Sequence, residues 1–114
     1  MKSSEKLCCV YLTAGSIDEL KNIGHVLVEK NLAACVNLLE NMTSIYKWEN
    51  KLEKCQEVVM IAKTRKTLMP KLIETVNSLH SYDCPCILEL SIQGGNPEFL
   101  NWIETETAVT EKKQ

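Results

Sequence analysis

The fold is decided by one stretch of sequence, residues 33–62, which reads AACVNLLENMTSIYKWENKLEKCQEVVMIA. Side chains alternate in polarity within residues 33–48, and Tyr46 and Trp48 share one face of the strand predicted there. A turn follows, because Asn50 readily takes the left-handed conformation that tight hairpins need. The end of the stretch is strongly apolar and predicts a returning strand with a buried centre. The segment therefore indicates one long β-hairpin.

The elements on either side of the hairpin alternate between strand and helix. Ser16, with Glu19 three residues later, is a capping box that opens a helix, and Pro70 is compatible only with the first turn of a second helix. Asn96 caps a short terminal helix that begins at Pro97. The predicted order is strand 7–12, helix 17–30, strand 33–48, strand 58–62, helix 68–79, strand 87–92 and a last helix from residue 97. This order predicts an α+β, ferredoxin-like βαββαβ sandwich with an antiparallel sheet, a long central hairpin and a C-terminal helix.

Length and charge limit the number of domains and the kinds of partner. The 114 residues suit one domain, which we place at residues 6–104, followed by a polar tail at residues 105–114. Thirteen basic and fifteen acidic side chains give a net charge of -2, which argues against a nucleic-acid partner. The RNA-recognition fold shares this strand order, but it needs aromatic side chains on its central strands. Residues 58–62 carry none.

Apolar runs and cysteines bear on the compartment. No apolar stretch approaches the roughly 20 residues that span a bilayer, so no membrane partner is expected. Residues 7–12 are too short for the apolar region of a signal peptide, which favours a cytoplasmic location. The six cysteines are therefore expected to be reduced.

The length of the hairpin suggests that the chain associates with copies of itself. A continuous strand over residues 33–48 would be about 50 Å long, whereas a domain of this size has a radius of gyration of about 13 Å. Its aromatic far end would project beyond the core and promote aggregation unless a partner covered it. The alternative is two ordinary strands, broken at residues 39–42, that fold back on the same subunit.

Five motifs together resemble the CutA family in their order and spacing. They are LAACVN at 32–37, SIYKWENK at 44–51, KT at 63–64, HSYDCP at 80–85 and GNPEFLNW at 95–102. The resemblance covers residues 7–102. It implies a ferredoxin-like homotrimer, similar in assembly to the PII signalling proteins, in which long hairpins pair between subunits. It also implies a link to the tolerance of divalent metals, copper in particular, but no agreed enzymatic reaction.

Two departures from the family pattern bear on its copper chemistry. Relatives commonly read His-Pro-Tyr-Glu-x-Pro-Glu-Ile where this chain reads HSYDCPCI, at residues 80–87. Cys86 therefore replaces the second acid of the pattern, and Cys84 is a further thiol. Some relatives also carry a cysteine, implicated in copper binding, before the threonine that ends the first strand. This chain has Leu12 at that position.

Aromatic and charged residues around the hairpin form a candidate ligand pocket between subunits. Its members are Tyr46, Trp48, Lys63, His80, Tyr82 and Asp83. A lysine at a strand end could hold a small anionic ligand, with a hydroxyl from Tyr82 and an acceptor from Asp83. The alternative is that Tyr46 and Trp48 only pack against a neighbouring subunit and that Lys63 is solvated.

The candidate metal ligands are His80, Cys84 and Cys86. Thiolates and imidazole suit soft ions such as Cu(I) or zinc, and copper is the only cofactor that the sequence suggests. Cys-Pro-Cys is not the Cys-x₂-Cys pairing of structural zinc sites, and no second pair follows it. The alternative is that these are ordinary loop and strand residues.

No nucleophile, base and acid can be combined into a catalytic arrangement, so no catalytic residue and no enzymatic activity are predicted. The sequence favours a trimeric, CutA-like protein of divalent-metal tolerance that binds ions or small ligands between subunits. Two alternatives stay open. One is a PII-like regulatory protein that binds a small molecule without metal chemistry, and the other is an enzyme with a site between subunits.

Overall fold

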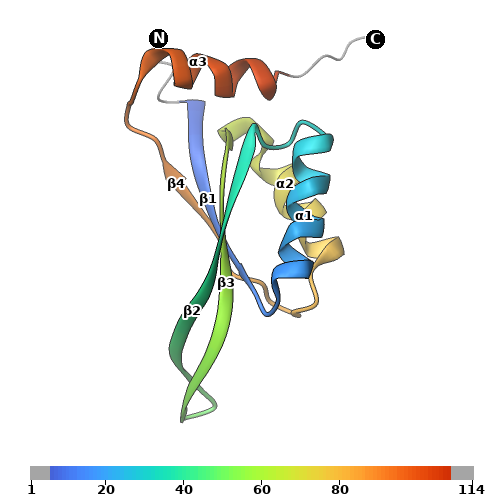
Figure 1. Ribbon diagram of the computed structural model, residues 1–114, viewed down its shortest axis with the longest axis vertical. Helices are drawn as coiled ribbons and strands as arrows, with labels where there is room; N and C mark the ends of the chain where they lie inside the picture. The colour runs from blue at the N-terminus through green and yellow to red at the C-terminus, as the bar shows by residue number, and fades with distance from the viewer. Residues whose placement is uncertain (1–5, 109–114) are drawn as a thin grey trace.

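The computed structural model describes residues 6–108, and it shows the predicted alternation of strands and helices (Figure 1). The elements are β1 (Leu7–Ala14), α1 (Ile17–Glu29), β2 (Cys35–Trp48), β3 (Lys51–Arg65), a 3₁₀ turn (Lys66–Leu68), α2 (Met69–Leu79), β4 (Ile87–Ser91) and α3 (Pro97–Glu106). The strands form one antiparallel sheet in the order β2-β3-β1-β4. This confirms the ferredoxin-like α+β fold that the sequence predicted.

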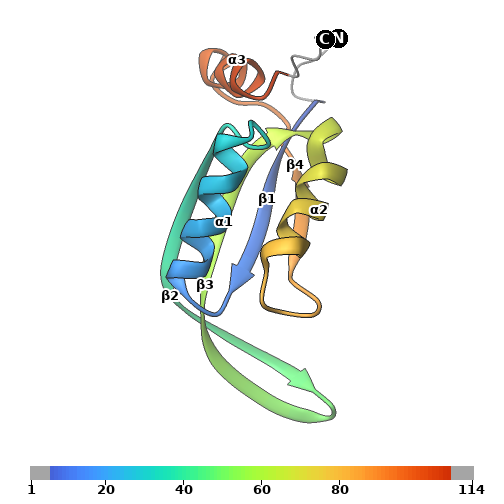
Figure 2. The ribbon, with the colours of Figure 1, turned by 90° about the vertical axis from the view of Figure 1, so that its right-hand side faces the viewer.

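The main core lies between the sheet and helices α1 and α2, which cover the same face of the sheet (Figure 2). Alternate side chains of β1, such as Val10 and Leu12, point into this core and are fully buried. Helix α1 contributes Leu20, Ile23 and Leu27 from positions spaced by three and four residues. Neither α1 nor α2 covers the opposite face of the sheet, and this leaves room there for a partner.

Ser16 begins α1 as predicted, but only half of the capping box forms. The Ser16 hydroxyl accepts a hydrogen bond from the Glu19 N–H at 3.2 Å. The Glu19 carboxylate does not return to the cap and instead accepts from Ser81, which lies far away in the sequence. The acid of the motif therefore links α1 to the loop that follows α2.

The long hairpin is present, and its strands remain paired from Cys35 to the turn. A register shift lies between Leu39 and Met42, where Asn41 has a φ of 64°. At the far end, Glu49 and Asn50 both have positive φ, at 51° and 66°, as a two-residue type I′ turn requires. The predicted alternative, two strands broken at residues 39–42 and folded back, is wrong.

The arm of the hairpin extends well beyond the two helices (Figure 1). The molecule measures 48 Å along its longest axis and only 22 Å along its shortest, and its radius of gyration is 15.2 Å. A compact domain of this length would have a radius of about 13 Å. The hairpin is the element that makes the molecule long.

Helix α3 crosses the other end of the sheet and packs on a small second core of Leu7, Ala34 and Ile103. Arg65 holds its C-terminal end, because the guanidinium donates to the Glu104 carbonyl at 2.6 Å and to the Thr107 hydroxyl at 3.1 Å. Thr107 is fully buried. The packed part of the chain thus continues past the domain end expected at residue 104. Residues 109–114 of the predicted tail lie outside the described residues.

Candidate functional site

A cleft of about 750 Å³ runs along the arm of the hairpin, from Thr13 and Glu57 to Trp48 beside the turn. The arm bends beneath the loop between α2 and β4 (Figure 2). Side chains from β1, β2, β3 and this loop form its walls. They are Thr13, Tyr46, Trp48, Glu53, Glu57, Tyr82, Asp83, Cys84 and Cys86. Pockets that bind small molecules in proteins have comparable volumes, so this cleft is the candidate site.

The pairing of β2 with β3 decides which hairpin residues face the cleft. Tyr46 lies opposite Glu53, and Ser44 lies opposite Cys55. Residues paired directly across two strands point to the same side of a sheet, and the side changes with each residue along a strand. Tyr46, Glu53 and Glu57 therefore share one side of the arm with Cys55 and Lys51, and the alternate residues of the two strands point away.

Glu57 links the arm to the loop. Its Oε1 accepts a hydrogen bond from the Ser44 hydroxyl at 2.6 Å, and its Oε2 accepts from the Tyr82 hydroxyl at 2.9 Å. Burial, followed by the bond to Glu57 and its charge, raises the pKa of Tyr82 to about 12. The Tyr82 phenol therefore stays protonated at neutral pH and continues to donate to Glu57.

Glu19 and His80 fix the loop from its other side. The Glu19 carboxylate accepts from the Ser81 N–H at 2.6 Å and from the Ser81 hydroxyl at 3.1 Å. The imidazole of His80 is buried, with Nδ1 accepting from the Tyr82 N–H at 3.1 Å and Nε2 lying 2.7 Å from the Thr13 carbonyl. A nitrogen that accepts carries no proton, so Nε2 is the one that donates to Thr13.

The structure brings together most of the residues that the sequence suggested, but not all. Tyr46, Trp48, Tyr82 and Asp83 line the cleft together with Cys84 and Cys86. His80 lies behind the cleft wall, with both ring nitrogens engaged by the backbone. A metal ion at His80 would have to displace one of these two bonds.

Lys63, the lysine expected to hold an anionic ligand, lies outside the cleft. It is paired with Cys9 on one side and Cys35 on the other, on the face of the sheet that α1 and α2 leave free. Its ammonium group contacts the side-chain oxygen of Asn37. Lys63 lies six residues along β3 from Glu57, the residue that contacts Tyr82, so their backbones are about 20 Å apart at ~3.3 Å per residue. The sequence had grouped Lys63 with Tyr82.

The cleft is anionic. Glu53, Glu57 and Asp83 line it, and no lysine, arginine or histidine does. Within residues 6–108, none of these three carboxylates forms an ion pair with a basic side chain. The sequence did not single out Glu53 or Glu57, because only the strand register shows that they face Tyr46 and Tyr82.

No set of metal ligands is already assembled in the single chain. Over the described residues 6–108, no three His, Cys, Asp or Glu side chains lie close enough together to hold a metal ion. Cys84 and Cys86 supply two thiols at the cleft wall, and all six cysteines are free. Two thiols are a partial donor set, which a further ligand would complete.

Comparison with known proteins decides the family. The chain matches the family model described as CutA1 divalent ion tolerance protein over residues 8–106. The chain belongs to the CutA1 divalent ion tolerance protein family. This confirms the resemblance on which the sequence analysis relied.

Individual CutA proteins are similar to this chain over most of its length. Mouse protein CutA is 41% identical over 97 residues, which are 85% of this chain and 55% of the mouse protein, so this chain spans about half of that relative. The CutA1 structure from Oryza sativa has a TM-score of 0.90 and 33% identity, and it covers 96% of this chain and 100% of that one. The periplasmic divalent cation tolerance protein CutA from Archaeoglobus fulgidus has a TM-score of 0.85 and 40% identity, with 89% and 98% covered.

The cytoplasmic location expected for this CutA1-family chain stays a prediction. Among residues 6–108, no helix is both long and apolar enough to cross a membrane. The relative from Archaeoglobus is named as periplasmic, so the cytoplasmic location expected from the sequence does not follow from the family.

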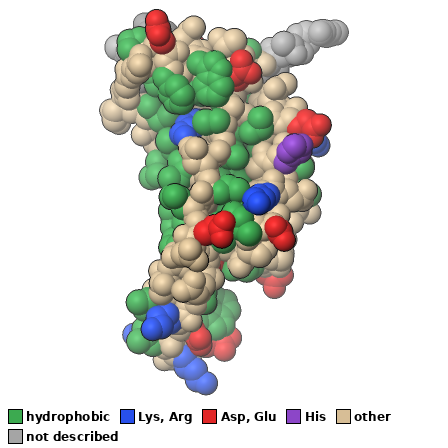
Figure 3. Space-filling model, viewed as in Figure 1, with side chains coloured by type: hydrophobic (Ala, Val, Ile, Leu, Met, Phe, Trp, Pro, Cys, Tyr) green, Lys and Arg blue, Asp and Glu red, His purple; other side chains and the backbone are tan. Residues whose placement is uncertain are grey.

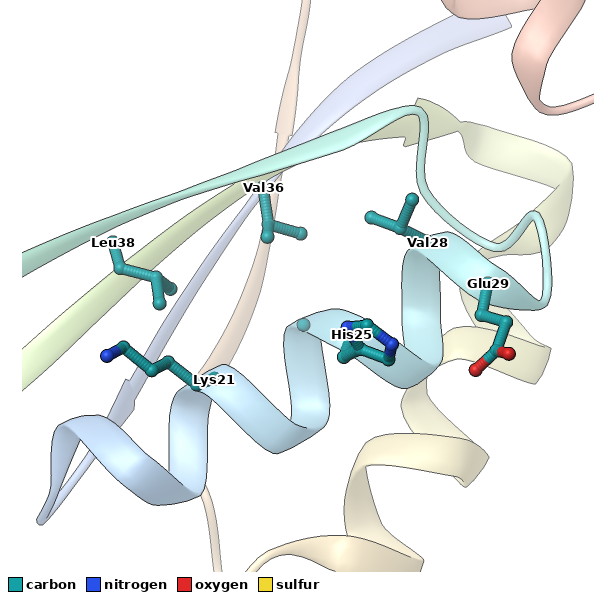
Figure 4. Close-up of a pocket in the computed structure, with 7 residues that line it drawn as sticks. Lys21, His25, Val28, Glu29, Val36 and Leu38 are labelled. Carbon is teal, nitrogen blue, oxygen red and sulfur yellow. The ribbon is translucent and has the colours of Figure 1, made fainter.

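A second hollow of about 630 Å³ lies between α1 and the edge strand β2 (Figure 4). Val36 and Leu38 point from β2 toward the helix, and Lys21, His25 and Glu29 stand along its outer side. This groove of the CutA1 fold has apolar walls and a rim that carries both signs of charge. The residues give no indication of a particular ligand.

The face of the sheet opposite α1 and α2 carries a helix only at one end, where α3 packs on Leu7. The rest of this face, called the helix-free face, exposes large apolar side chains. Leu39, Leu88 and Leu90 are each more than half exposed, at 55%, 54% and 53%. Hydrophobic side chains also gather along the side of the molecule that faces away from α1 and α2 (Figure 3). Contiguous apolar surface of this kind is typical of protein interfaces.

Proposed function

We propose that this protein contributes to divalent-metal tolerance by binding metal ions, copper in particular, in the cleft between the arm of the hairpin and the loop that joins α2 to β4. One observation carries the proposal: the cleft is lined by three carboxylates and two thiols and by no basic side chain. Such a lining attracts cations and disfavours the small anionic ligand that Lys63 was expected to hold. The proposed role is binding, not catalysis.

Cys84 and Cys86 are the proposed ligands that select the metal. Both side chains line the cleft, and Asp83 lies directly beside them in the sequence. Thiolates favour soft ions such as Cu(I), whereas carboxylates alone favour harder ions. Since no third ligand is in place within the described chain, we propose that a movement of the loop or a second subunit supplies it.

A thermal-shift experiment tests this proposal. Copper, held as Cu(I) under reducing conditions, is expected to raise the melting temperature of the wild type, because a ligand at 100 times its Kd stabilises a protein by about 2.7 kcal/mol. Cys84→Ser/Cys86→Ser should lose this shift. The matched control Cys9→Ser/Cys35→Ser removes two thiols from the helix-free face and should keep it. An equal copper shift in the two double variants would refute the thiol site.

We further propose that the protein works as a homotrimer. The support is the apolar helix-free face, together with an arm that extends beyond its own core. Residues from a second copy would then lie near the arm and could complete the metal site.

A further inference from the structure

The arm of the hairpin is joined to the rest of the sheet through an irregular segment. Pairing of β3 with β1 ends at Val58, and the register of β2 on β3 shifts between Leu39 and Met42. Beyond these points, in the described part of the chain, residues 42–57 pair only with one another. Because irregularities of this kind bend a strand, we call residues 39–42 the hinge between the arm and the sheet.

One side-chain hydrogen bond joins the arm to the loop across the cleft. The Tyr82 hydroxyl donates to Oε2 of Glu57 at 2.9 Å. Among residues 6–108, the other side-chain hydrogen bonds of the arm stay within it, except at the hinge, where the Tyr11 hydroxyl lies 3.5 Å from Sδ of Met42. A thioether is only a weak acceptor. The bond from Tyr82 is therefore the strongest side-chain hydrogen bond between the arm and the body.

Tyr82 is itself held by the body of the molecule. Its N–H donates to Nδ1 of His80 at 3.1 Å, and the two rings lie 4.8 Å apart between centroids. The His80 imidazole in turn lies 2.7 Å from the Thr13 carbonyl of β1. The preceding Ser81 is bound by the Glu19 carboxylate of α1. Tyr82 therefore connects a firmly anchored loop to an arm that has a hinge.

We propose that the Tyr82–Glu57 hydrogen bond is a latch that sets the direction of the arm, so that a movement of the loop between α2 and β4 is transmitted to the hairpin. The arm is a long lever. From Val58 to Lys51 it extends about 23 Å, so a rotation of about 10° at the hinge moves its end by about 4 Å. A hydrogen bond of this length is lost once its two oxygens separate by about 1 Å more, so a small movement of Tyr82 releases the latch.

The loop that carries Tyr82 also carries the proposed metal ligands. Cys84 and Cys86 follow Tyr82 by two and four residues and line the cleft. Two thiols are an incomplete donor set, and a loop movement that completes it carries Tyr82 away from Glu57. Metal binding is therefore expected to release the arm. This trigger rests on the proposed metal function, whereas the latch itself does not.

Hydrogen–deuterium exchange of the full chain, followed by mass spectrometry, tests the latch. Tyr82→Phe removes only the hydroxyl, and exchange in peptides that cover residues 39–44 and 55–60 should become at least about threefold faster, because local opening no longer breaks this bond. Peptides from α1 should keep their rate. The matched control Tyr46→Phe removes a hydroxyl whose partner, Cys55, lies on the arm itself at 3.8 Å. This control should leave exchange at the hinge unchanged.

A double-mutant cycle shows whether Tyr82 acts through Glu57. The double variant Tyr82→Phe/Glu57→Ala should exchange no faster at the hinge than Glu57→Ala alone, because both changes break the same bond. Three results would overturn the latch. They are an unchanged exchange rate at the hinge in Tyr82→Phe, an equal acceleration in Tyr46→Phe, and an equal acceleration in α1, which would mean that Tyr82 stabilises the whole fold.

The same measurement with Cu(I) under reducing conditions tests the trigger. Copper should accelerate exchange at the hinge in the wild type and not in Cys84→Ser/Cys86→Ser. A copper thermal shift with unchanged exchange at the hinge would overturn the trigger and leave the metal site standing. The absence of any copper shift would overturn the proposed metal function and the trigger with it, while the comparison of Tyr82→Phe with Tyr46→Phe still decides the latch.

Discussion

At the scale of single residues, chemically identical side chains differ in reactivity because of where the strands place them. Cys8 points into the core between the sheet and the helices and has no exposed surface, whereas Cys84 is exposed on the loop. Burial, followed by the nearby charges of Glu89 and Cys9, raises the pKa of Cys8 from 9.0 to about 11. The thiolate is the reactive form of cysteine, so Cys8 should be inert in the folded protein.

We predict that iodoacetamide at pH 8 labels Cys84 rapidly and leaves Cys8 unmodified until the protein is unfolded in urea. Peptide mass spectrometry after a time course measures both labelling rates in one sample. Labelling of Cys8 in the native protein at the rate of Cys84 would contradict the burial of Cys8.

The raised pKa of Cys8 also makes the stability of the fold depend on pH. The buried neutral thiol contributes its full stabilisation below about pH 9, and this contribution is lost as the pH rises from 9 through 11.

At the scale of elements, the approach of α1 to the sheet depends on a glycine. A Cβ atom added at Gly24 would lie 2.9 Å from Cγ2 of Val36 and 3.1 Å from Cε of Met60. The Met60 end is flexible, but a valine is stiff about its first side-chain torsion. An added methyl group must therefore push α1 away from β2 or move β2 itself.

Gly24→Ala is expected to lower the free energy of unfolding by about 1 kcal/mol. Overpacking costs about 1–3 kcal/mol, and the gain in helix propensity of about 1 kcal/mol offsets part of it. Urea denaturation measures the difference. Gly94→Ala is the control, since nothing lies within 4 Å of the added atom there, and it should be neutral. The Gly24→Ala/Val36→Ala double variant should relieve the clash between the added methyl group and the valine. A Gly24→Ala protein more stable than the wild type would contradict the steric contact.

The sequence predicted the hairpin because its signals are local. Alternation of side chains and an asparagine at the turn need no information from the rest of the chain. The composition of the cleft could not be predicted from local signals. Glu57 contacts Ser44 and Tyr82 only because of the register of β2 on β3 and the shift in that register between Leu39 and Met42. Lys63 was placed with the pocket residues for a related reason: the sequence does not show that Lys63 lies six residues along β3 from Glu57, which puts their backbones about 20 Å apart at ~3.3 Å per residue.

At the scale of the whole molecule, the two faces of the sheet are covered unequally. Helices α1 and α2 bury one face, and the other exposes Leu39, Leu88 and Leu90 next to a projecting arm. The strands β2 and β4 are both edges with unpaired backbone groups, which natural proteins normally protect. Assembly into a closed ring of subunits would cover the face and the edges together.

We predict that light scattering after size-exclusion chromatography gives three times the chain mass of 12.9 kDa at micromolar concentration. Leu88→Glu/Leu90→Glu places two charges on the helix-free face and should produce monomers, because a stable interface of about 800 Å² per subunit does not tolerate unpaired buried charge. The control Ile73→Glu adds a charge on the outer side of α2, at a side chain that is also partly exposed, and should remain trimeric. A wild type that elutes as a monomer would show that the apolar face serves another partner. The arm would then need a different explanation, since a hairpin of this length has no core of its own to pack against.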